Sequence, residues 1–120
     1  MTQIDRVSVR ALKPKAGEVA SILAVADQLG RDELAPRAQE MDERREPPIE
    51  NFQAMARAGI LGITVPVQFG GLGADGATVL QVTETFTRYC AVTAFLLVQH
   101  TGVCRSIAVG GSPIAADLLP

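Results

Sequence analysis

A glycine- and proline-rich segment constrains the fold of this chain more than any other feature. It holds five glycines and one proline: Gly59, Gly62, Pro66, Gly70, Gly71 and Gly73. Each glycine weakens an α-helix and the proline removes a backbone donor, so the segment cannot form one. The β-branched run Ile63-Thr64-Val65 favours an extended backbone, which also suits the residue before a proline. The segment therefore predicts a fixed, largely buried connector, irregular over residues 59–74, between two helical regions.

Two helices are expected before the connector. Apolar residues recur at steps of three and four over residues 16–44, and Pro36 is expected to kink this long helix without ending it. Pro47-Pro48 breaks it and starts a second helix, for which Gly59 is the expected stop. The expected buried side chains of the first helix are Val19, Ile22, Leu23, Ala26 and Leu29, and those of the second are Ile49, Phe52, Met55 and Ala56.

Three helices are expected after the connector. Asp75 can cap a helix over residues 77–89, and Glu84 and Arg88 stand four residues apart on it. The next helix, over residues 91–109, is apolar nearly all round, which predicts the central, buried helix of a bundle. Ser112-Pro113 has the pattern of a cap and first turn for a last helix.

These patterns predict an all-α fold. We expect an orthogonal or up-and-down bundle of about five helices, packed around the buried fourth helix. Residues 1–15 lack sustained periodicity and are expected to form a loose N-terminal arm, so the helical domain would span residues 16–120.

Charge is distributed very unevenly along the chain. Residues 1–58 hold 19 of the 24 charged side chains, although the net charge is only −2. The absence of a basic field excludes nucleic acid as an expected partner. The second half has too little charge to give every outer helix a solvated face, so the domain is expected to belong to a larger body or to associate with itself.

The composition also bears on the compartment. Cys90 and Cys104 lack the spacing of a metal or redox motif, and are expected to be buried thiols of a cytoplasmic protein. Only 16 uncharged residues separate Arg88 from Arg105, fewer than the roughly 20 that a membrane span needs. We therefore expect no membrane span.

Two patterns resemble functional sites. Gly71-x-Gly73-x-x-Gly76 matches the dinucleotide fingerprint, but no strand precedes it and position 96 is a leucine, where the fingerprint expects an acidic residue. We interpret it as a turn with close backbone packing. His100, the only histidine, is expected to be structural or to line a pocket and not to act as a general base. The residues alone predict no catalytic or metal site and leave the function unknown.

An ordered set of motifs resembles the acyl-CoA dehydrogenase family. Val65-Pro66-Val67-Gln68-Phe69-Gly70-Gly71-Leu72-Gly73 is similar to the family's VP-x-x-(Tyr/Phe)-GG-x-G signature. The flanking segments agree in order over about residues 16–120. They are Leu34-Ala35-Pro36 with Glu40 and Asp42, Pro48 to Gly62, and Glu84 to Arg88 followed by Thr93-Ala94. The chain thus resembles the family's N-terminal helical domain.

The resemblance implies an FAD-dependent oxidoreductase of three domains that desaturates an acyl-CoA between its α and β carbons, as in fatty acid metabolism. It places the main flavin contacts and the catalytic glutamate in the two later domains. The 120-residue chain alone is therefore expected to be inactive, with no catalytic, metal or tight FAD site. The resemblance also implies an electron-transfer partner and a homo-oligomer for the complete enzyme.

The resemblance further implies a role for the helix over residues 91–109 as one wall of the acyl pocket. The matching stripe is Ala94, Leu97, Val98 and Thr101, and ordinary core packing is the alternative interpretation. Two alternatives to the dehydrogenase remain open. One is a flavin-dependent monooxygenase of the same fold, and the other is a stand-alone helical interaction domain without chemistry.

Overall fold

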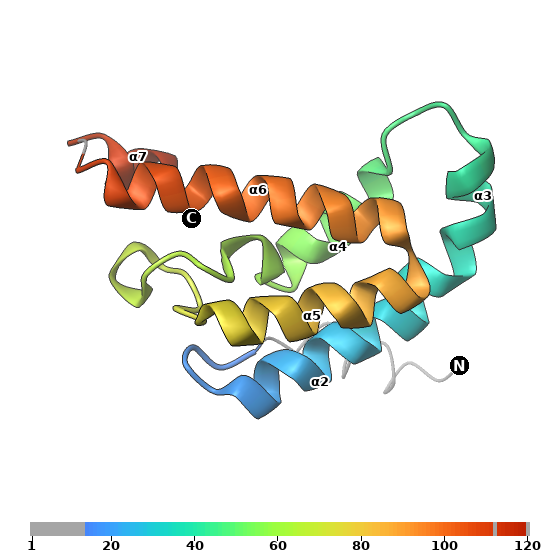
Figure 1. Cartoon of the computed structure of the whole chain (residues 1–120), viewed down its shortest axis with the longest axis horizontal. Coiled ribbons are helices and arrows are strands. Elements are labelled where there is room, and N and C mark those ends of the chain that lie inside the picture. Colours follow the sequence, from blue (N-terminus) through green and yellow to red (C-terminus); the bar gives the residue numbers. More distant parts are fainter. Residues whose placement is uncertain (1–13, 112, 120) are drawn as a thin grey trace.

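The computed structural model describes residues 14–111 and 113–119, and these residues form an all-α fold without a strand, as predicted (Figure 1). Residues 1–13 of the predicted arm lie outside the described residues, as does Ser112, the predicted cap of the last helix. The helices are α2 (Val19–Leu29), α3 (Ala38–Glu43), α4 (Ile49–Arg57), α5 (Gly76–Tyr89), α6 (Ala91–Val109) and the short α7 (Ala115–Leu118).

The first helical run continues from α2 to α3 past Pro36, as predicted. A π-helical turn over Gly30–Leu34 and a 3-10 turn over Ala35–Arg37 join the two helices. The Ala35 amide donates to the carbonyl of Gly30, five residues back. Because proline has no amide hydrogen, the change of hydrogen-bond register spreads over this stretch and the run bends without ending. Val19, predicted to be buried at the start of this run, is exposed.

Helix α4 has the predicted ends but a different buried face. It begins after Pro48 without a side-chain cap and stops at Gly59, whose φ of 77° suits a glycine. Ile49 and Ala56 were predicted to be buried and are exposed. Met55 is buried as predicted, and it shares the buried face with Asn51 and Ala54. The buried face of α4 therefore differs from the predicted one, because it includes Asn51, whose side chain bonds to Arg37 and Thr93 inside the molecule.

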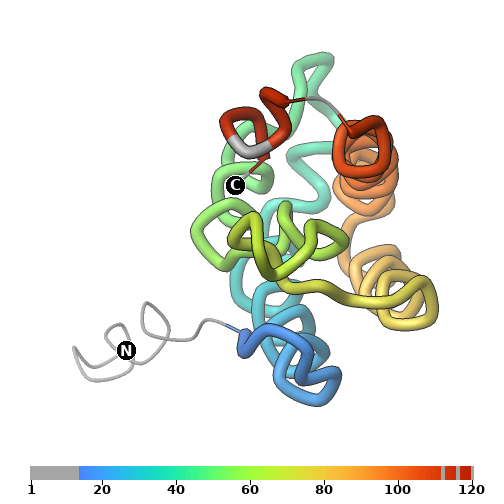
Figure 2. Tube along the Cα trace, turned by 90° about the vertical axis from the view of Figure 1, so that its left-hand side faces the viewer, coloured from blue at the N-terminus to red at the C-terminus, as the bar shows by residue number. Residues whose placement is uncertain are grey.

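The connector is irregular, as predicted, and its buried part lies at residues 60–65 and at Gly71 and Leu72, whereas Val67, Gln68 and Gly70 are exposed. Figure 2, which looks at the molecule from that end, shows the connector in the centre of the view. It forms 3-10 turns over Ile60–Gly62 and Val67–Phe69. The extended backbone predicted at Ile63 is wrong, since its φ and ψ are −57° and −39°. The amides of Ile63 and Val65 donate to carbonyls three residues back, and these turns outweigh the β-propensity of the run.

Helix α5 contacts two other long helices of the bundle. It packs against both α2 and α6 (Figure 1). Asp75 caps it by accepting a hydrogen bond from the Thr78 amide at 2.8 Å, as predicted. Val82 and Phe86 on its inner face are fully buried. The Arg88 guanidinium contacts the Thr85 hydroxyl at 3.5 Å, and no ion pair joins it to Glu84 among the described residues.

The boundaries of α6 are as predicted, but the predicted burial of this helix holds on one side only. One face of α6 packs against α5, the connector and α7, while five large apolar side chains on its other side are exposed: Val92, Phe95, Val98, Val103 and Val109. An all-round apolar sequence predicted burial on every side. The elements described here cover only one side.

Candidate functional site

The inner face of α6 carries three of the four residues predicted to form an acyl-pocket wall. Ala94, Leu97 and Thr101 are 2%, 0% and 6% exposed. Val98 is 44% exposed, because it follows Leu97 by one residue, which turns it by about 100° around the helix. The structure thus brings the first three together beneath α6 and separates Val98 from them. Whether they line a substrate pocket remains a prediction.

Thr101 lies between two clusters of buried side chains. Ala94 and Leu97 belong to the main core, which includes Val82 and Phe86 of α5. Cys104 belongs to a smaller cluster that α6 forms with the connector and α7, made by Val65, Ala115 and Leu119. The Thr101 hydroxyl donates to the Val98 carbonyl at 2.9 Å. Its polar group is therefore satisfied within the helix, and its methyl group is left for packing.

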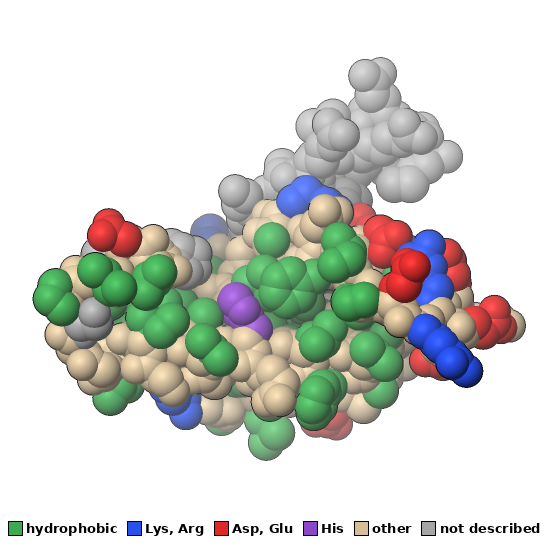
Figure 3. Space-filling view, turned by 90° about the horizontal axis from the view of Figure 1, so that it is seen from above, with side chains coloured by type: hydrophobic (Ala, Val, Ile, Leu, Met, Phe, Trp, Pro, Cys, Tyr) green, Lys and Arg blue, Asp and Glu red, His purple; other side chains and the backbone are tan. Residues whose placement is uncertain are grey.

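His100 contacts two side chains beside this face. Its Nε2 lies 3.4 Å from the Cys104 Sγ, and its ring packs edge-on against Phe52 of α4, with 5.6 Å between ring centroids. Burial raises the pKa of the Cys104 thiol, so the neutral thiol predominates near pH 7 and is a poor nucleophile. Figure 3 shows the imidazole at the surface among apolar side chains.

The contact between His100 and Cys104 was missed in the sequence analysis. Its signal was their separation by four residues, which puts two side chains on the same side of a helix. Both cysteines are free and buried, as predicted. The described residues contain no group of three or more His, Cys, Asp or Glu side chains that could hold a metal ion.

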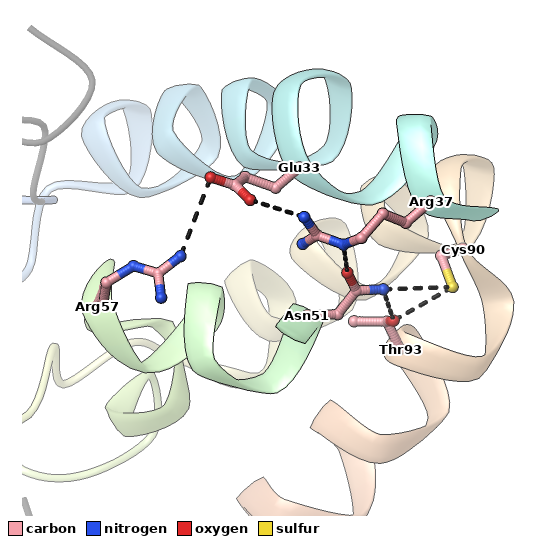
Figure 4. Close-up of polar contacts among 6 residues, drawn as sticks. All are labelled: Glu33, Arg37, Asn51, Arg57, Cys90 and Thr93. Atoms are coloured by element: carbon pink, nitrogen blue, oxygen red, sulfur yellow. Dashed lines mark hydrogen bonds and ion pairs between the residues drawn. The ribbon is translucent and has the colours of Figure 1, made fainter. Parts of the chain in front are cut away.

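A buried polar network, also missed, joins the first half of the chain to the start of α6 (Figure 4). The Asn51 side chain is fully buried at its centre. Its Oδ1 accepts from the Arg37 Nε at 2.9 Å, and its Nδ2 donates to the Thr93 Oγ1 at 2.9 Å. The Thr93 hydroxyl in turn lies 3.2 Å from the Cys90 Sγ. The network fixes α4 against the junction of α5 and α6.

The charged end of the network lies in the turns that join α2 to α3. Arg37 Nη1 and Glu33 Oε2 lie 3.2 Å apart, and Glu33 also stands 4.0 Å from the Arg57 guanidinium (Figure 4). Each of these three side chains has a partner within the chain, although the Arg37 Nη2 is buried without a hydrogen-bond partner among the described residues. The network contains no described group poised as an acid, a base or a nucleophile. Its arrangement is suited to holding the elements together.

By length and composition alone, α6 is the one helix of the described chain that could cross a membrane. Only 28% of its most apolar stretch is buried in the molecule. One such helix is weak evidence for a span, because a helix that packs in the core of a protein meets the same criteria.

Comparison with known proteins identifies the family. The family profile described as "Acyl-CoA dehydrogenase, N-terminal domain" matches residues 17–116. The chain belongs to this family. The match covers all the helices from α2 to α6 and begins beside the turn before α2.

Curated relatives agree with this assignment. The chain is 36% identical over 92 residues to the cyclohex-1-ene-1-carbonyl-CoA dehydrogenase of Syntrophus aciditrophicus, a match of 77% of this chain and 22% of the relative. It is 31% identical to the short-chain-specific acyl-CoA dehydrogenase of Clostridium acetobutylicum, over 67% of this chain and 21% of the relative. It is 33% identical to the 3-sulfinopropanoyl-CoA desulfinase of Variovorax paradoxus, over 80% of this chain and 25% of the relative.

The chain thus spans about a fifth to a quarter of the length of these relatives. No solved structure matches it. The assignment to the acyl-CoA dehydrogenase family therefore concerns the N-terminal helical domain that the profile describes.

The glycine loop of this acyl-CoA dehydrogenase domain does not fit the pyrophosphate of FAD. A phosphate cradle needs free backbone amides, but the amides of Leu72, Gly73 and Ala74 donate to carbonyls of the connector at 2.8 to 3.0 Å. A Cβ at Gly71 would collide with the Val65 carbonyl and Cβ. The glycine there permits close backbone packing, which is the interpretation that the sequence favoured.

Proposed function

We propose that this chain forms the N-terminal helical part of an FAD-dependent oxidoreductase that acts on an acyl-CoA thioester, by removing hydrogen from its α and β carbons. The match of the family profile to residues 17–116 carries the proposal. The names of the relatives supply the substrate class, because the dehydrogenases and the desulfinase all act on CoA thioesters. The names agree on a CoA thioester as the substrate but differ in the reaction, so they support the substrate class more strongly than the removal of hydrogen.

In this proposal the chain contributes structure to the enzyme and not reacting groups. The described residues offer no acid–base pair and no phosphate cradle, so the flavin contacts and the base are proposed to lie in further domains. Ala94, Leu97, Val98 and Thr101 are proposed as part of one wall of the acyl pocket, with Val98 on the exposed side of α6 and the other three beneath the helix. A dry wall suits the joint removal of a proton and a hydride. A cytoplasmic location and an electron-transfer partner complete the proposal.

The experiment compares the 120-residue chain with the longest reading frame that contains this sequence. Both are purified, supplied with FAD and titrated anaerobically with acyl-CoA esters while flavin absorbance is recorded. The longer protein is expected to be yellow and to bleach with an acyl-CoA, whereas the 120-residue chain remains colourless. Stoichiometric flavin on the short chain would contradict the division of roles.

Two further outcomes separate the alternatives. A flavoprotein that no acyl-CoA reduces, but that consumes oxygen with an aromatic or sulfur-containing substrate, would favour the monooxygenase. A reading frame that ends at residue 120 would contradict the proposal and favour a stand-alone interaction domain.

A further inference from the structure

His100 and Cys104 place two metal-binding atoms side by side on α6. The two residues are four apart, so their side chains lie on the same side of the helix. The His100 Nε2 lies 3.4 Å from the Cys104 Sγ. Imidazole nitrogen and thiolate sulfur are both preferred ligand atoms of zinc(II) in proteins. The spacing of the two cysteines predicts no metal site, whereas the pairing of Cys104 with His100 supplies two zinc ligands at one point.

The separation of the two atoms fits a tetrahedral zinc ion. Zinc binds sulfur at about 2.3 Å and nitrogen at about 2.0 Å, with tetrahedral angles between its ligands. Two such ligands stand about 3.5 Å apart, against the 3.4 Å between His100 and Cys104. Both atoms can therefore bind one ion without a change in the backbone of α6. The same distance allows a hydrogen bond between the thiol and the imidazole, which holds the two side chains in this position before an ion arrives.

The surroundings of the pair orient one ligand and shield the other. The His100 ring packs edge-on against Phe52 of α4, with 5.6 Å between ring centroids, and this contact restricts its rotation. Figure 3 shows the imidazole at the surface, where an ion can reach it from solvent. Cys104 is 5% exposed and packs in the smaller buried cluster of α6, α7 and the connector. An apolar shell of this kind limits the access of water to a metal ligand.

We propose that His100 and Cys104 bind a zinc(II) ion through Nε2 and Sγ. The thiol proton is released to solvent on binding, and Nε2 uses its lone pair in the tautomer that carries its hydrogen on Nδ1. The described residues supply no third His, Cys, Asp or Glu ligand. Two of the four positions of a tetrahedral ion are therefore open to water or to donor atoms of a small molecule.

The site is independent of the proposed enzymatic function. Its two ligands differ from the residues of the proposed acyl-pocket wall, and binding needs neither a flavin nor a CoA thioester. Arg105, the neighbouring charge in the sequence, is exposed and turned by about 100° from Cys104 around the helix. Failure of the metal site would leave the proposed function standing, and the reverse also holds.

The first test titrates the reduced 120-residue chain, without an affinity tag, with cobalt(II) as a coloured substitute for zinc(II). Binding should produce a sulfur-to-cobalt charge-transfer band, and added zinc should remove it. Cys104→Ser should abolish this band and weaken binding by about tenfold or more. Cys90→Ser is the matched control and should retain both. Cys90 is similarly buried at the start of the same helix, with no histidine one turn away.

The second test moves the imidazole without changing the composition. The double variant Gln99→His with His100→Gln keeps one histidine and both cysteines, but points the ring about 100° around the helix from its present direction. Because Gln99 is exposed, the fold should persist, and circular dichroism checks the helix content. Zinc affinity, measured by competition with a chelating dye, should fall by about tenfold or more.

Each contrary result overturns the proposal. A wild-type chain that binds cobalt no more tightly than Cys104→Ser would show that the pair is joined by a hydrogen bond alone. Equal zinc affinities of the wild type and the double variant would show an adventitious ion only. Loss of the charge-transfer band in Cys90→Ser, with the band retained in Cys104→Ser, would place the ion at the other cysteine.

Discussion

The surface of the α2–α4 region and the outer face of α6 differ sharply. The first region carries ion pairs along its exposed faces, with Asp27 to Arg31 and Glu40 to Arg44 spaced i,i+4 at 3.2 and 2.7 Å. The outer face of α6 carries a single charge, Arg105, among exposed apolar side chains. Exposed ion pairs contribute little to folding stability, so their main effect is to keep that surface solvated. The α2–α4 surface is therefore covered by charged side chains, whereas the outer face of α6 leaves apolar side chains exposed to water.

The two regions meet at the connector and at Asn51. Close backbone packing at Gly71 holds the connector in place, and Asn51 joins α4 to the first turn of α6. Changes at these joints test whether the regions fold as one unit. Changes away from them test how each surface behaves.

Gly71→Ala should give the largest effect on stability. The added methyl group collides with the Val65 backbone, which cannot move aside without breaking the connector, so the expected loss is about 3 kcal/mol. Urea denaturation followed by circular dichroism measures it. Gly76→Ala is the control because a Cβ there meets nothing within 4 Å. Equal effects of the two substitutions would refute the close packing.

Asn51→Leu should cost about 2 to 3 kcal/mol, because it removes the donor to the buried Thr93 hydroxyl oxygen and the acceptor of the Arg37 Nε. The same denaturation experiment measures the loss. Gln53→Leu on the exposed side of α4 should change stability very little. A transition that separates into two steps in the Asn51 variant would show that the two regions are coupled mainly through this residue.

Thr101→Phe distinguishes core from pocket on the inner face of α6. If Thr101 packs in the core, the larger ring overpacks it and should cost roughly 1 to 3 kcal/mol. If it lines a pocket, the complete enzyme should stay folded and prefer shorter acyl chains. Melting temperature and kcat/KM across acyl lengths, measured on the same variant, separate these outcomes. Lost stability with an unchanged length profile would end the pocket proposal.

Asp75 should give the smallest effect and one that depends on pH. Hydrogen bonds from the Thr78 hydroxyl and amide lower the pKa of this carboxyl below its ordinary 3.8. A lowered pKa stabilises the fold above the ordinary value, and that stabilisation is lost as the pH falls through the folded-state pKa. Asp75→Ala should therefore lower the melting temperature at pH 7 and differ less from the wild type near pH 2. Asp75→Asn keeps a capping side chain and should retain more of the stability. A loss in Asp75→Ala that is independent of pH would contradict this assignment.

Local signals predicted much of the fold. Asp75 and Gly59 mark helix ends through a side-chain cap and a left-handed backbone, and both are readable from residue type alone. The burial of Asn51 could not be predicted, because the partner that satisfies its amide, Thr93, is 42 residues away. The same long-range contact explains the wrong face assigned to α4. Periodicity also gives no sign of the π-helical turn at Gly30, whose missing side chain makes room for the Tyr89 ring.

The candidate site shows the same division. Helical spacing placed Ala94, Leu97 and Thr101 on one face, but could not show that α5 and the connector cover that face while Val98 stays exposed. An apolar sequence predicts that a helix face will be buried, but it does not identify the element or chain that packs against that face. The partner depends on chains and segments beyond the helix itself.

Hydroxyl-radical footprinting of the 120-residue chain, at concentrations below and above its association, tests the central contrast most directly. Phe95 and Val98, which are exposed on the outer face of α6, should lose reactivity as the chain associates. Ile49 and Leu80, which are 54% and 69% exposed on α4 and α5, should react equally at both concentrations. Protection of Ile49 or Leu80 with unchanged reactivity at Phe95 would contradict the account, because the surface buried on association would then lie outside α6.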